Sequence, residues 1–391
     1  MEKKVIGLAV FLSFSIILNV IVFSFYLEKY DIPELFERLD NLNKNKKLEL
    51  PIIPKIYEEN ILSMEFEKNV TTKEDFVMWG STISKKFSEM YNLEDLEDVE
   101  LNNLKIEFIQ ENDSNILTKY SASALDDDKI IFYELKPTNQ IQPKQAIFII
   151  PGSGNQGASD VLNLESDFED YYYHKNIGQV LVNEGFIVYV IENRGWGERT
   201  IDAGLYCENE NVYCSGNVLR NYLPSVGKDL FSLQIKDSLQ VFNFIKTQEY
   251  VDSKNIAVIG LSLGGGIAQG LAVIEPEIKS VALPSGLVSF YKTKATGSTH
   301  GMLEFFDFPD LVASIAPKPV YLSWGENEKS SFRFEVETSY SANIVKKSYA
   351  ILDAEENVTV VFHKDKFNQG HTLDIDTLLQ FLTNTLGRPH N

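Results

Sequence analysis

The sequence has few of the residues on which metal and disulfide chemistry depend. Its 391 residues include 2 cysteines and 5 histidines. Cys207 and Cys214 share one polar segment that contains no histidine, so we expect neither a zinc site nor any other cofactor. In an oxidising compartment the two cysteines would close a short disulfide, and two free thiols are the alternative.

Positive charge is also scarce. The chain has 36 Lys and Arg against 56 Asp and Glu, for a formal net charge of −20. An acidic surface repels polyanions, so nucleic acid is not an expected partner. Internal repeats and low-complexity tracts are absent, and 44% hydrophobic residues are enough for a packed core. We therefore predict a folded globular protein that does not act on nucleic acid.

Charged residues are missing altogether from residues 5–27. About 20 helical residues cross a bilayer, whereas the apolar part of a cleaved signal peptide has roughly 7–15. We therefore predict that residues 1–30 are a cytoplasmic tip and a transmembrane signal anchor, with a cleaved signal peptide as the alternative. Lys3 and Lys4 precede the run and acidic residues follow it, which predicts a single-pass protein of the cell membrane with its bulk outside the cytoplasm.

The remaining chain divides into two predicted parts. Residues 31–100 are expected to form a juxtamembrane spacer and an N-terminal helical extension. Thr71 and Glu74 have the spacing of a capping box, and apolar residues follow at helical intervals. This pattern predicts a helix that packs on a catalytic domain formed by residues 101–391.

Residues 101–391 alternate between strand-like and helix-like segments. Near-continuous apolar runs, typical of parallel strands buried on both faces, occur at residues 146–150, 186–191, 256–259, 279–283, 320–324 and 358–362. Helical patterns lie between them, as at residues 229–247 and 332–352. Three earlier strands at 104–109, 116–120 and 129–135 are expected to enter the sheet antiparallel. We predict a doubly wound, mostly parallel α/β sheet with its site at the carboxyl ends of the strands.

The strongest motif lies between a predicted strand and a predicted helix. Gly260, Ser262 and Gly264 form a G-x-S-x-G sequence, in which a sharp turn lifts a nucleophilic serine above the sheet. The two glycines leave room for crossing chains, and the free N–H of Leu263 at the helix start is a natural donor to an oxyanion. A glycine-rich turn without chemistry is the alternative.

A second oxyanion donor is expected in the loop that follows residues 146–150. This loop begins Pro151-Gly-Ser-Gly. The backbone N–H of Ser153 is the candidate donor. A type II turn built on Pro-Gly, with no catalytic role, is the alternative.

The general base can be sought by elimination, since the triad of this kind of sheet follows the chain order serine, acid, histidine. His174 and His300 precede the last strands, and His390 lies at the end of the chain. His371 lies in a loop between the last predicted strand and a helix over residues 373–386, so it fits better than His363. The acid should follow residues 320–324, where two carboxylates, Glu328 and Glu326, compete.

Residues 71–386 resemble the α/β-hydrolases that include acetyl xylan esterases, dienelactone hydrolases and the prolyl-oligopeptidase catalytic domain. The segments that carry this resemblance are 251–265 around the serine, an R-G-x-G sequence at 194–197, residues 306–311, and Ile-Ala-Pro-Lys-Pro at 315–319. It implies a triad of Ser262, Glu328 and His371, because the family's G-x-x-D spacing selects Glu328. The chain departs from the family by having Glu in place of Asp, and Pro151 in place of the oxyanion-loop histidine. Arg194 is expected to be structural and paired with a buried carboxylate.

The predicted function is hydrolysis of a small-molecule or polymer-borne carboxylic ester through an acyl-enzyme on Ser262. Two alternatives remain open: a peptidase or amidase that uses the same triad, and a catalytically inactive surface-binding domain. The insertion at residues 285–314 is expected to form a small cap, in which aromatic residues line the acyl pocket or pack in the core.

Overall fold

The computed structural model describes residues 61–96, 99–138, 143–153, 157–164, 174–201, 214–293, 301–326, 328, 334–364 and 370–389. These residues belong to one compact unit, residues 58–391. The predicted membrane anchor, residues 1–30, and Cys207 of the predicted disulfide lie outside the described residues. Within the described ranges, no helix has both the length and the apolar character needed to cross a bilayer.

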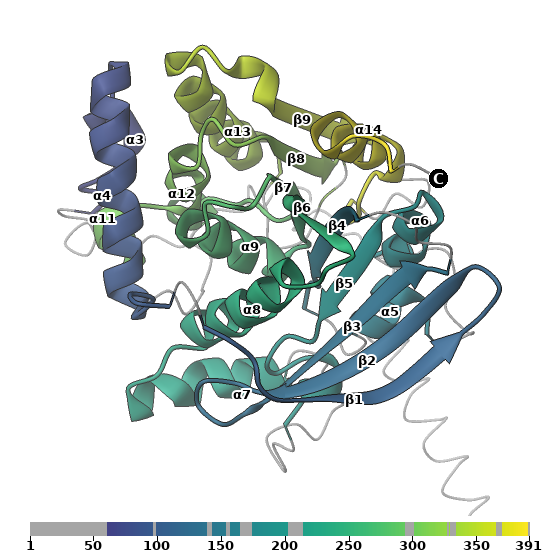
Figure 1. Cartoon of the computed structure of the whole chain (residues 1–391). Helices are drawn as coiled ribbons and strands as arrows, with labels where there is room; N and C mark the ends of the chain where they lie inside the picture. The colour runs from purple at the N-terminus through teal and green to yellow at the C-terminus, as the bar shows by residue number, and fades with distance from the viewer. Residues whose placement is uncertain are drawn as a thin grey trace, which may run out of the picture. The chain divides into compact units, whose positions relative to one another are not determined.

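The described residues form a nine-stranded sheet (Figure 1), in the order β1-β2-β3-β5-β4-β6-β7-β8-β9. The pairs β1–β2, β2–β3 and β3–β5 are antiparallel, and every other pair is parallel. The predicted antiparallel entry and parallel body are therefore both confirmed. The strands span Asn102–Glu111 (β1), Asn115–Ser123 (β2), Lys129–Pro137 (β3), Lys144–Ile150 (β4), Ile187–Ile191 (β5), Val251–Gly260 (β6), Ser280–Pro284 (β7), Val320–Gly325 (β8) and Val358–His363 (β9).

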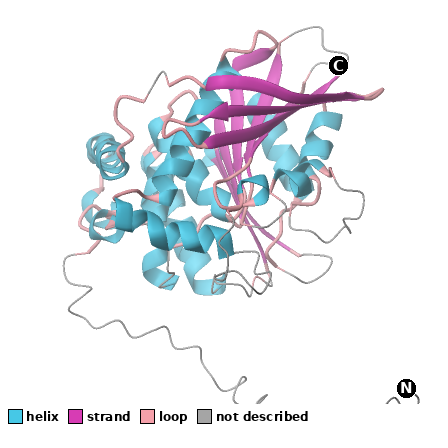
Figure 2. Cartoon of the chain, turned by 90° about the horizontal axis from the view of Figure 1, so that it is seen from below, coloured by secondary structure: helices cyan, strands magenta, loops and turns pink. Residues whose placement is uncertain are grey.

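Helices cover both faces of the sheet, as Figure 2 shows. One face is packed by α4 (Lys73–Tyr91), α8 (Leu230–Lys246), α9 (Leu263–Ile274), α12 (Phe308–Ser314) and α13 (Phe334–Ile351). The other is packed by α5 (Ala158–Leu162), α6 (Ile177–Asn183) and α14 (Ile375–Leu386). The remaining short helices are α3 (Phe66–Asn69), α7 (Cys214–Tyr222), α10 (Phe290–Thr293) and α11 (Met302–Phe305).

The double burial explains why the parallel strands consist of apolar runs. Successive side chains of a strand point to opposite faces of its sheet. In β4, Phe148 and Ile150 join the cluster under α8 and α9, whereas Ile147 and Ile149 join the cluster under α5, α6 and α14. Because both faces are buried, residues 146–150 of β4 are all apolar and no alternation appears in this run.

The register of the sheet gathers several turns at one edge. Ile150 of β4 pairs with Gly260 of β6, and Gly325 of β8 pairs with His363 of β9. These strands are parallel and end together, so the turns that follow β4, β6 and β8 lie at the same edge of the sheet. This edge is where the sequence predicts the site.

The helix predicted from the Thr71–Glu74 spacing is α4, but its cap lies one residue later. Thr72 is the N-cap: its hydroxyl accepts a hydrogen bond from the Asp75 N–H, and the Asp75 carboxylate accepts from the Thr72 N–H, both at 3.0 Å. The same carboxylate also accepts from the N–H and hydroxyl of Thr71. One aspartate thus satisfies the donors of both threonines, and Glu74 is not needed.

This N-terminal helix is part of the main core. Its buried side chains pack in the same hydrophobic cluster as α9 and α12; they are Phe76, Trp79, Ile83, Phe87 and Tyr91. The predicted packing of the helix on the domain is therefore confirmed.

The segment before α4 joins the insertion between β7 and β8. The N–H of Leu62 donates to Leu303 O at 2.8 Å, and that of Met64 donates to Phe305 O at 2.7 Å. The N–H of Phe66 donates to the buried carboxylate of Asp310 at 2.9 Å. Residues 62–66 are therefore bonded to residues 303–310, more than 230 positions along the chain.

Candidate active site

Ser262 follows β6 in a strained turn. Its φ is +50° and its ψ −114°, and α9 begins at the next residue. A non-glycine residue in such a region costs on the order of 1–3 kcal/mol and persists only where its surroundings hold it. Its N–H donates to Pro284 O at 3.3 Å, and the N–H of Leu261 donates to Ile150 O at 3.1 Å. The neighbouring strands therefore hold the turn in place.

The glycines of the motif are required by close backbone approach, as predicted. A Cβ on Gly260 would lie 2.4 Å from Gly264 O, and a Cβ on Gly264 would lie 2.1 Å from Ile150 O. Either contact is far inside van der Waals separation. The turn can therefore form only with glycine at these two positions.

The structure brings together the three residues predicted as a triad. His371 Nε2 lies 2.9 Å from Ser262 Oγ, and His371 Nδ1 forms a hydrogen bond with Glu328 Oε1. Ser262 comes from the turn after β6, Glu328 from the loop after β8, and His371 from the segment between β9 and α14. The side chain of His371 is 26% exposed, whereas that of Glu328 is fully buried.

Glu328 has a second partner that the sequence did not indicate. The hydroxyl of Ser285 donates to Glu328 Oε2 at 3.0 Å, so both carboxylate oxygens are engaged. Ser285 directly follows β7 and has a φ of +46°. Its place at the carboxyl end of a buried strand was the available signal, but no motif marks it.

The two alternatives to Glu328 and His371 lie elsewhere. Glu326 is 45% exposed and forms an ion pair with Lys364 at 3.9 Å, so it is not the carboxylate beside His371. Its N–H donates to His363 O at 2.8 Å. His363 is buried, and its Nε2 lies 3.2 Å from Thr372 O. It therefore contacts the segment that carries His371.

The two predicted oxyanion donors lie on adjoining turns. Leu263 is the first residue of α9, where a helix offers its own N–H groups no acceptor. A Cβ on Gly264 would be 2.6 Å from Pro151 O, so the loop after β4 lies against the first turn of α9. Ser153 is in that loop, two residues past Pro151.

Arg194 has the structural role predicted for it. It is buried and forms hydrogen bonds with Asp237 at 2.6 Å and with Asp126 at 2.8 and 2.7 Å. Hydrogen bonds from Arg194 hold the pKa of Asp126 well below its usual value. These contacts join the loop after β5 to α8 and to the turn between β2 and β3.

A family model described as the Abhydrolase family matches residues 49–289, which include Ser262 and both predicted oxyanion turns. The chain belongs to the Abhydrolase family. Its sheet order, strained serine turn and helices on both faces are those of an α/β-hydrolase fold.

Other comparisons agree on the fold. YtaP of Bacillus subtilis strain 168, provisionally named a hydrolase, is 25% identical over 174 residues, and the match spans 44% of this chain and 53% of YtaP. A Bacteroides fragilis protein provisionally named an acetyl xylan esterase has a TM-score of 0.64 at 18% identity, covering 81% of this chain and 89% of its own. A glucuronoyl esterase from Teredinibacter turnerae T7901 has a TM-score of 0.53 at 14% identity, covering 80% and 86%.

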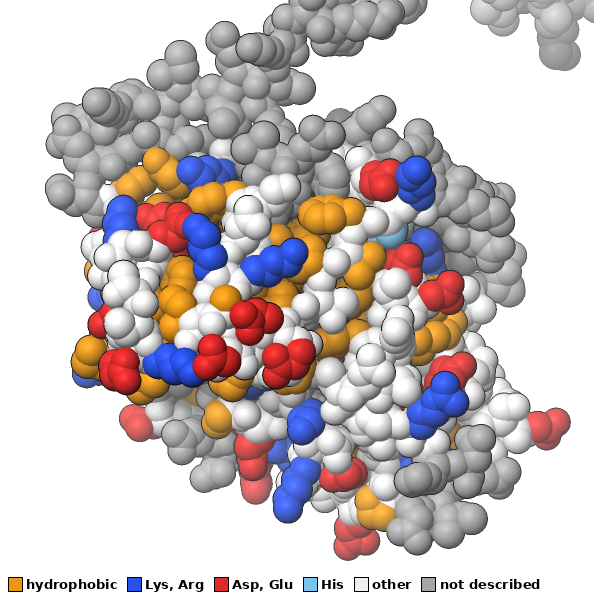
Figure 3. All heavy atoms as spheres, turned by 90° about the horizontal axis from the view of Figure 1, so that it is seen from above, with side chains coloured by type: hydrophobic (Ala, Val, Ile, Leu, Met, Phe, Trp, Pro, Cys, Tyr) orange, Lys and Arg blue, Asp and Glu red, His pale blue; other side chains and the backbone are white. Residues whose placement is uncertain are grey.

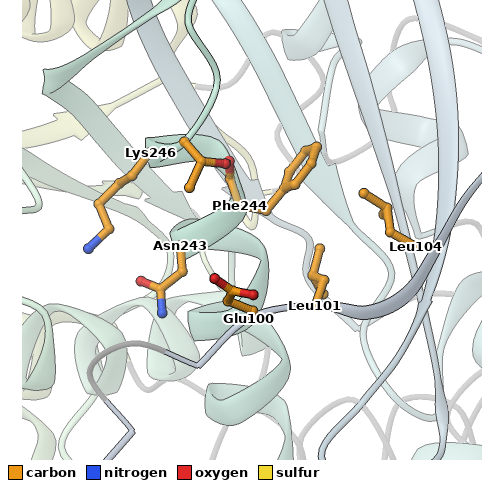
Figure 4. Close-up of a pocket in the computed structure, with 7 residues that line it drawn as sticks. Glu100, Leu101, Leu104, Asn243, Phe244 and Lys246 are labelled. Atoms are coloured by element: carbon orange, nitrogen blue, oxygen red, sulfur yellow. The ribbon is translucent and has the colours of Figure 1, made fainter.

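A cavity of about 380 Å³ in this Abhydrolase-family protein lies away from the triad. It is lined by Glu100, Leu101 and Leu104 and by the end of α8, including Asn243, Phe244 and Lys246 (Figure 4). Helices that connect parallel strands run antiparallel to them, so the end of α8 lies at the opposite edge of the sheet from Ser262. This cavity is therefore not the substrate site.

The insertion after β7 contributes to the core. Phe306 is fully buried in the main cluster, and Phe290 stacks edge-on against Phe308 with ring centroids 4.8 Å apart.

On the face shown in Figure 3, acidic and basic side chains are interspersed with apolar ones. No group of three or more metal-ligating side chains gathers within the described residues.

Proposed function

We propose that this protein hydrolyses carboxylic esters through an acyl-enzyme on Ser262. His371 Nε2 removes the hydroxyl proton as Ser262 Oγ attacks the ester carbon. Glu328 accepts a hydrogen bond from Nδ1–H, which fixes the tautomer with a free Nε2 and stabilises the imidazolium that forms. The N–H groups of Leu263 and Ser153 stabilise the tetrahedral oxyanion. His371 then protonates the departing alcohol.

The second half of the reaction uses the same groups. His371 removes a proton from water, which attacks the acyl carbon, and Ser262 leaves with that proton. The products are the alcohol and the carboxylic acid. The observation that carries this proposal is the continuous contact from Ser262 Oγ through both ring nitrogens of His371 to the buried carboxylate of Glu328.

For the substrate, we propose an ester carried on a carbohydrate polymer. Support comes from the named activities of structurally similar proteins, which include acetyl xylan and glucuronoyl esterases. A small-molecule carboxylic ester, hydrolysed by the same steps, is the second candidate substrate.

The uncharged run at residues 5–27 supports a further proposal, that residues 1–30 anchor the protein in the cell membrane with residues 101–391 outside the cytoplasm.

The nucleophile is tested with a fluorophosphonate probe on the full-length chain. We expect wild type to be labelled and Ser262→Ala to lose the label. Labelling that persists in Ser262→Ala contradicts the assignment of the nucleophile. A folded wild type without any labelling favours an inactive binding domain instead.

The substrate class is tested with matched panels. Acetylated xylan, glucuronoyl esters, small aryl esters of increasing acyl length and peptide amides are compared by kcat/KM. We expect turnover of esters and none of amides; efficient amide cleavage would instead indicate a peptidase.

The location is tested by adding protease to intact cells. The protease should digest residues 101–391, and protection of these residues would contradict a location outside the cytoplasm.

A further inference from the structure

One peptide unit next to the proposed oxyanion site is bonded at both of its polar atoms. The C=O of Pro151 accepts from Asn193 Nδ2 at 2.7 Å, and the N–H of Gly152 donates to His174 Nε2 at 3.1 Å. These two atoms belong to the same planar peptide group. Asn193 and His174 are both buried, at 3% and 4% exposure. The plane of this peptide is therefore set by two side chains that water cannot readily replace.

The tautomer of His174 follows from the hydrogen bonds at its two ring nitrogens. Nε2 accepts a hydrogen bond from the Gly152 N–H, so it must carry a lone pair, and the ring proton resides on Nδ1. Nδ1 lies 2.5 Å from Asp160 Oδ2, where it donates to the carboxylate. An imidazole protonated on Nε2 would place two N–H groups against each other. The buried Asp160 therefore selects the tautomer that can hold the Gly152 N–H.

The peptide group held in this way lies against the nucleophile turn. Ile150, the last residue of β4, pairs with Gly260, and the Pro151 carbonyl contacts the first turn of α9 at Gly264. The next N–H along the chain after Gly152 is that of Ser153. Once the Pro151–Gly152 plane is fixed, only the two dihedrals of Gly152 separate it from the Ser153 peptide.

We propose that His174, with Asp160 and Asn193, is a positioning residue that orients the Ser153 N–H toward the oxyanion. This inference rests on the proposed esterase function. Oxyanion donors act by being fixed before charge develops, and a misplacement of about 1 Å can cost a factor of about 100 in rate. His174 supplies its imidazole to the loop after β4 from 22 positions further along the chain.

Two substitutions of His174 separate the parts of this arrangement. In His174→Gln the amide nitrogen can donate to Asp160 while the amide oxygen accepts from the Gly152 N–H. In His174→Asn the side chain is one carbon shorter, so it reaches Asp160 but not Gly152. The pair therefore differs in the one contact that the proposal requires.

The experiment measures kcat, KM and thermal unfolding of the full-length wild type, His174→Gln and His174→Asn with an ester that wild type hydrolyses. We expect His174→Asn to lower kcat about 10- to 100-fold with KM within about threefold, because the oxyanion contact forms in the transition state. We expect His174→Gln to restore kcat to within about threefold of wild type. Equal kcat in the three proteins, or kcat losses that follow the losses of thermal stability in both variants, would overturn the proposal.

A second measurement does not depend on turnover. Ring ¹⁵N shifts of the histidine-labelled full-length chain, with the His174 signal identified by its absence in His174→Asn, should show a neutral ring protonated on Nδ1. An Nε2-protonated ring or an imidazolium at pH 7 would overturn the proposal. If wild type hydrolyses no ester, the esterase function fails, whereas the ring shifts still decide whether His174 can hold the Gly152 N–H.

Discussion

The molecule contains two histidine–carboxylate pairs of the same design at one edge of its sheet. In each, a carboxylate contacts Nδ1 and leaves Nε2 as an acceptor: Glu328 for His371, and Asp160 for His174. His371 faces a serine hydroxyl, and its side chain is 26% exposed; His174 faces a backbone N–H, and its side chain is 5% exposed. A hydroxyl proton can be transferred to imidazole, whereas an amide proton can only be held. The partner and the exposure of each ring thus determine whether the same arrangement does chemistry or fixes geometry.

The largest expected effect comes from His371→Ala. Loss of the base from a hydrolase triad lowers kcat by about 10⁴- to 10⁶-fold. We expect this loss in steady-state ester hydrolysis, with an unchanged unfolding temperature. If His371→Ala costs no more than His174→Asn, the two rings do not differ in the way proposed.

The next effect distinguishes the two carboxylates of the loop after β8. Glu328→Gln leaves the imidazole without its acid, and we expect kcat to fall by about 10³- to 10⁴-fold. Glu326→Gln is the matched control, because Glu326 is exposed and paired only loosely with Lys364. It should retain kcat within about twofold. The reverse result would place the acid at Glu326.

A smaller effect is expected at Ser285, whose hydroxyl donates to Glu328. Ser285→Ala should lower kcat about 10-fold, which corresponds to about 1.4 kcal/mol, near the low end of what a hydrogen bond to a charged group contributes. In a His371→Ala background the same substitution should have no further effect, because Ser285 acts through that ring. His174→Asn, in contrast, should still lower the residual rate in that background. If Ser285→Ala and His174→Asn have the same effect in the His371→Ala background, Ser285 and His174 do not act through separate parts of the site.

The smallest effect on activity is expected at Glu192, which accepts from the Ala158 N–H at the start of the helix that carries Asp160. Burial raises the pKa of Glu192 to about 8. The native state therefore keeps a proton that the unfolded chain releases near pH 4.5, and the free energy of unfolding decreases as pH rises from about 4.5 to 8.

Glu192→Gln, which is neutral throughout, should remove this decrease and raise the free energy of unfolding above pH 8 by a few kcal/mol at most. Denaturant unfolding at a series of pH values measures both the pH dependence and the free energy of unfolding above pH 8. We expect kcat at pH 7 to stay within about twofold of wild type. An unchanged pH slope in the variant would show that Glu192 is ionised in the folded protein.

The parts of the fold that follow from local rules were predictable. Parallel strands buried on both faces consist largely of apolar residues, so the apolar runs within β4 to β8 were visible in the sequence, and the half-buried edge strand β9 has a similar run. Ser262 was identified because its turn admits only glycine at 260 and 264. His371 followed from chain order. The inferences about the strands and Ser262 use constraints that act within a few residues of the chain, whereas the inference about His371 uses the order of the segments along it.

The remaining features depend on contacts between distant segments. Glu328 and Glu326 are two residues apart in one loop, and what distinguishes them is that Glu328 contacts His371 and Ser285, each 43 positions away along the chain. His174 was set aside because it precedes the last strands, which is a sound reason against a base but says nothing of backbone contacts. Its partners Asp160 and Gly152 are 14 and 22 residues away and form no motif. The cap of α4 was misplaced by one residue because Asp75 satisfies two adjacent threonines.

The bonding of residues 62–66 to the insertion after β7 sets a limit on how far the chain can be shortened from its N-terminus. A fragment that starts after Phe66 would lose four backbone donors to residues 303–310 and would leave the indole N–H of Trp79 without the carbonyl of Met64, which accepts it at 2.6 Å. A fragment that starts by residue 58 would retain all of them. The N-terminal boundary for expression is therefore defined by hydrogen bonds to the insertion between β7 and β8, and it lies well before residue 101.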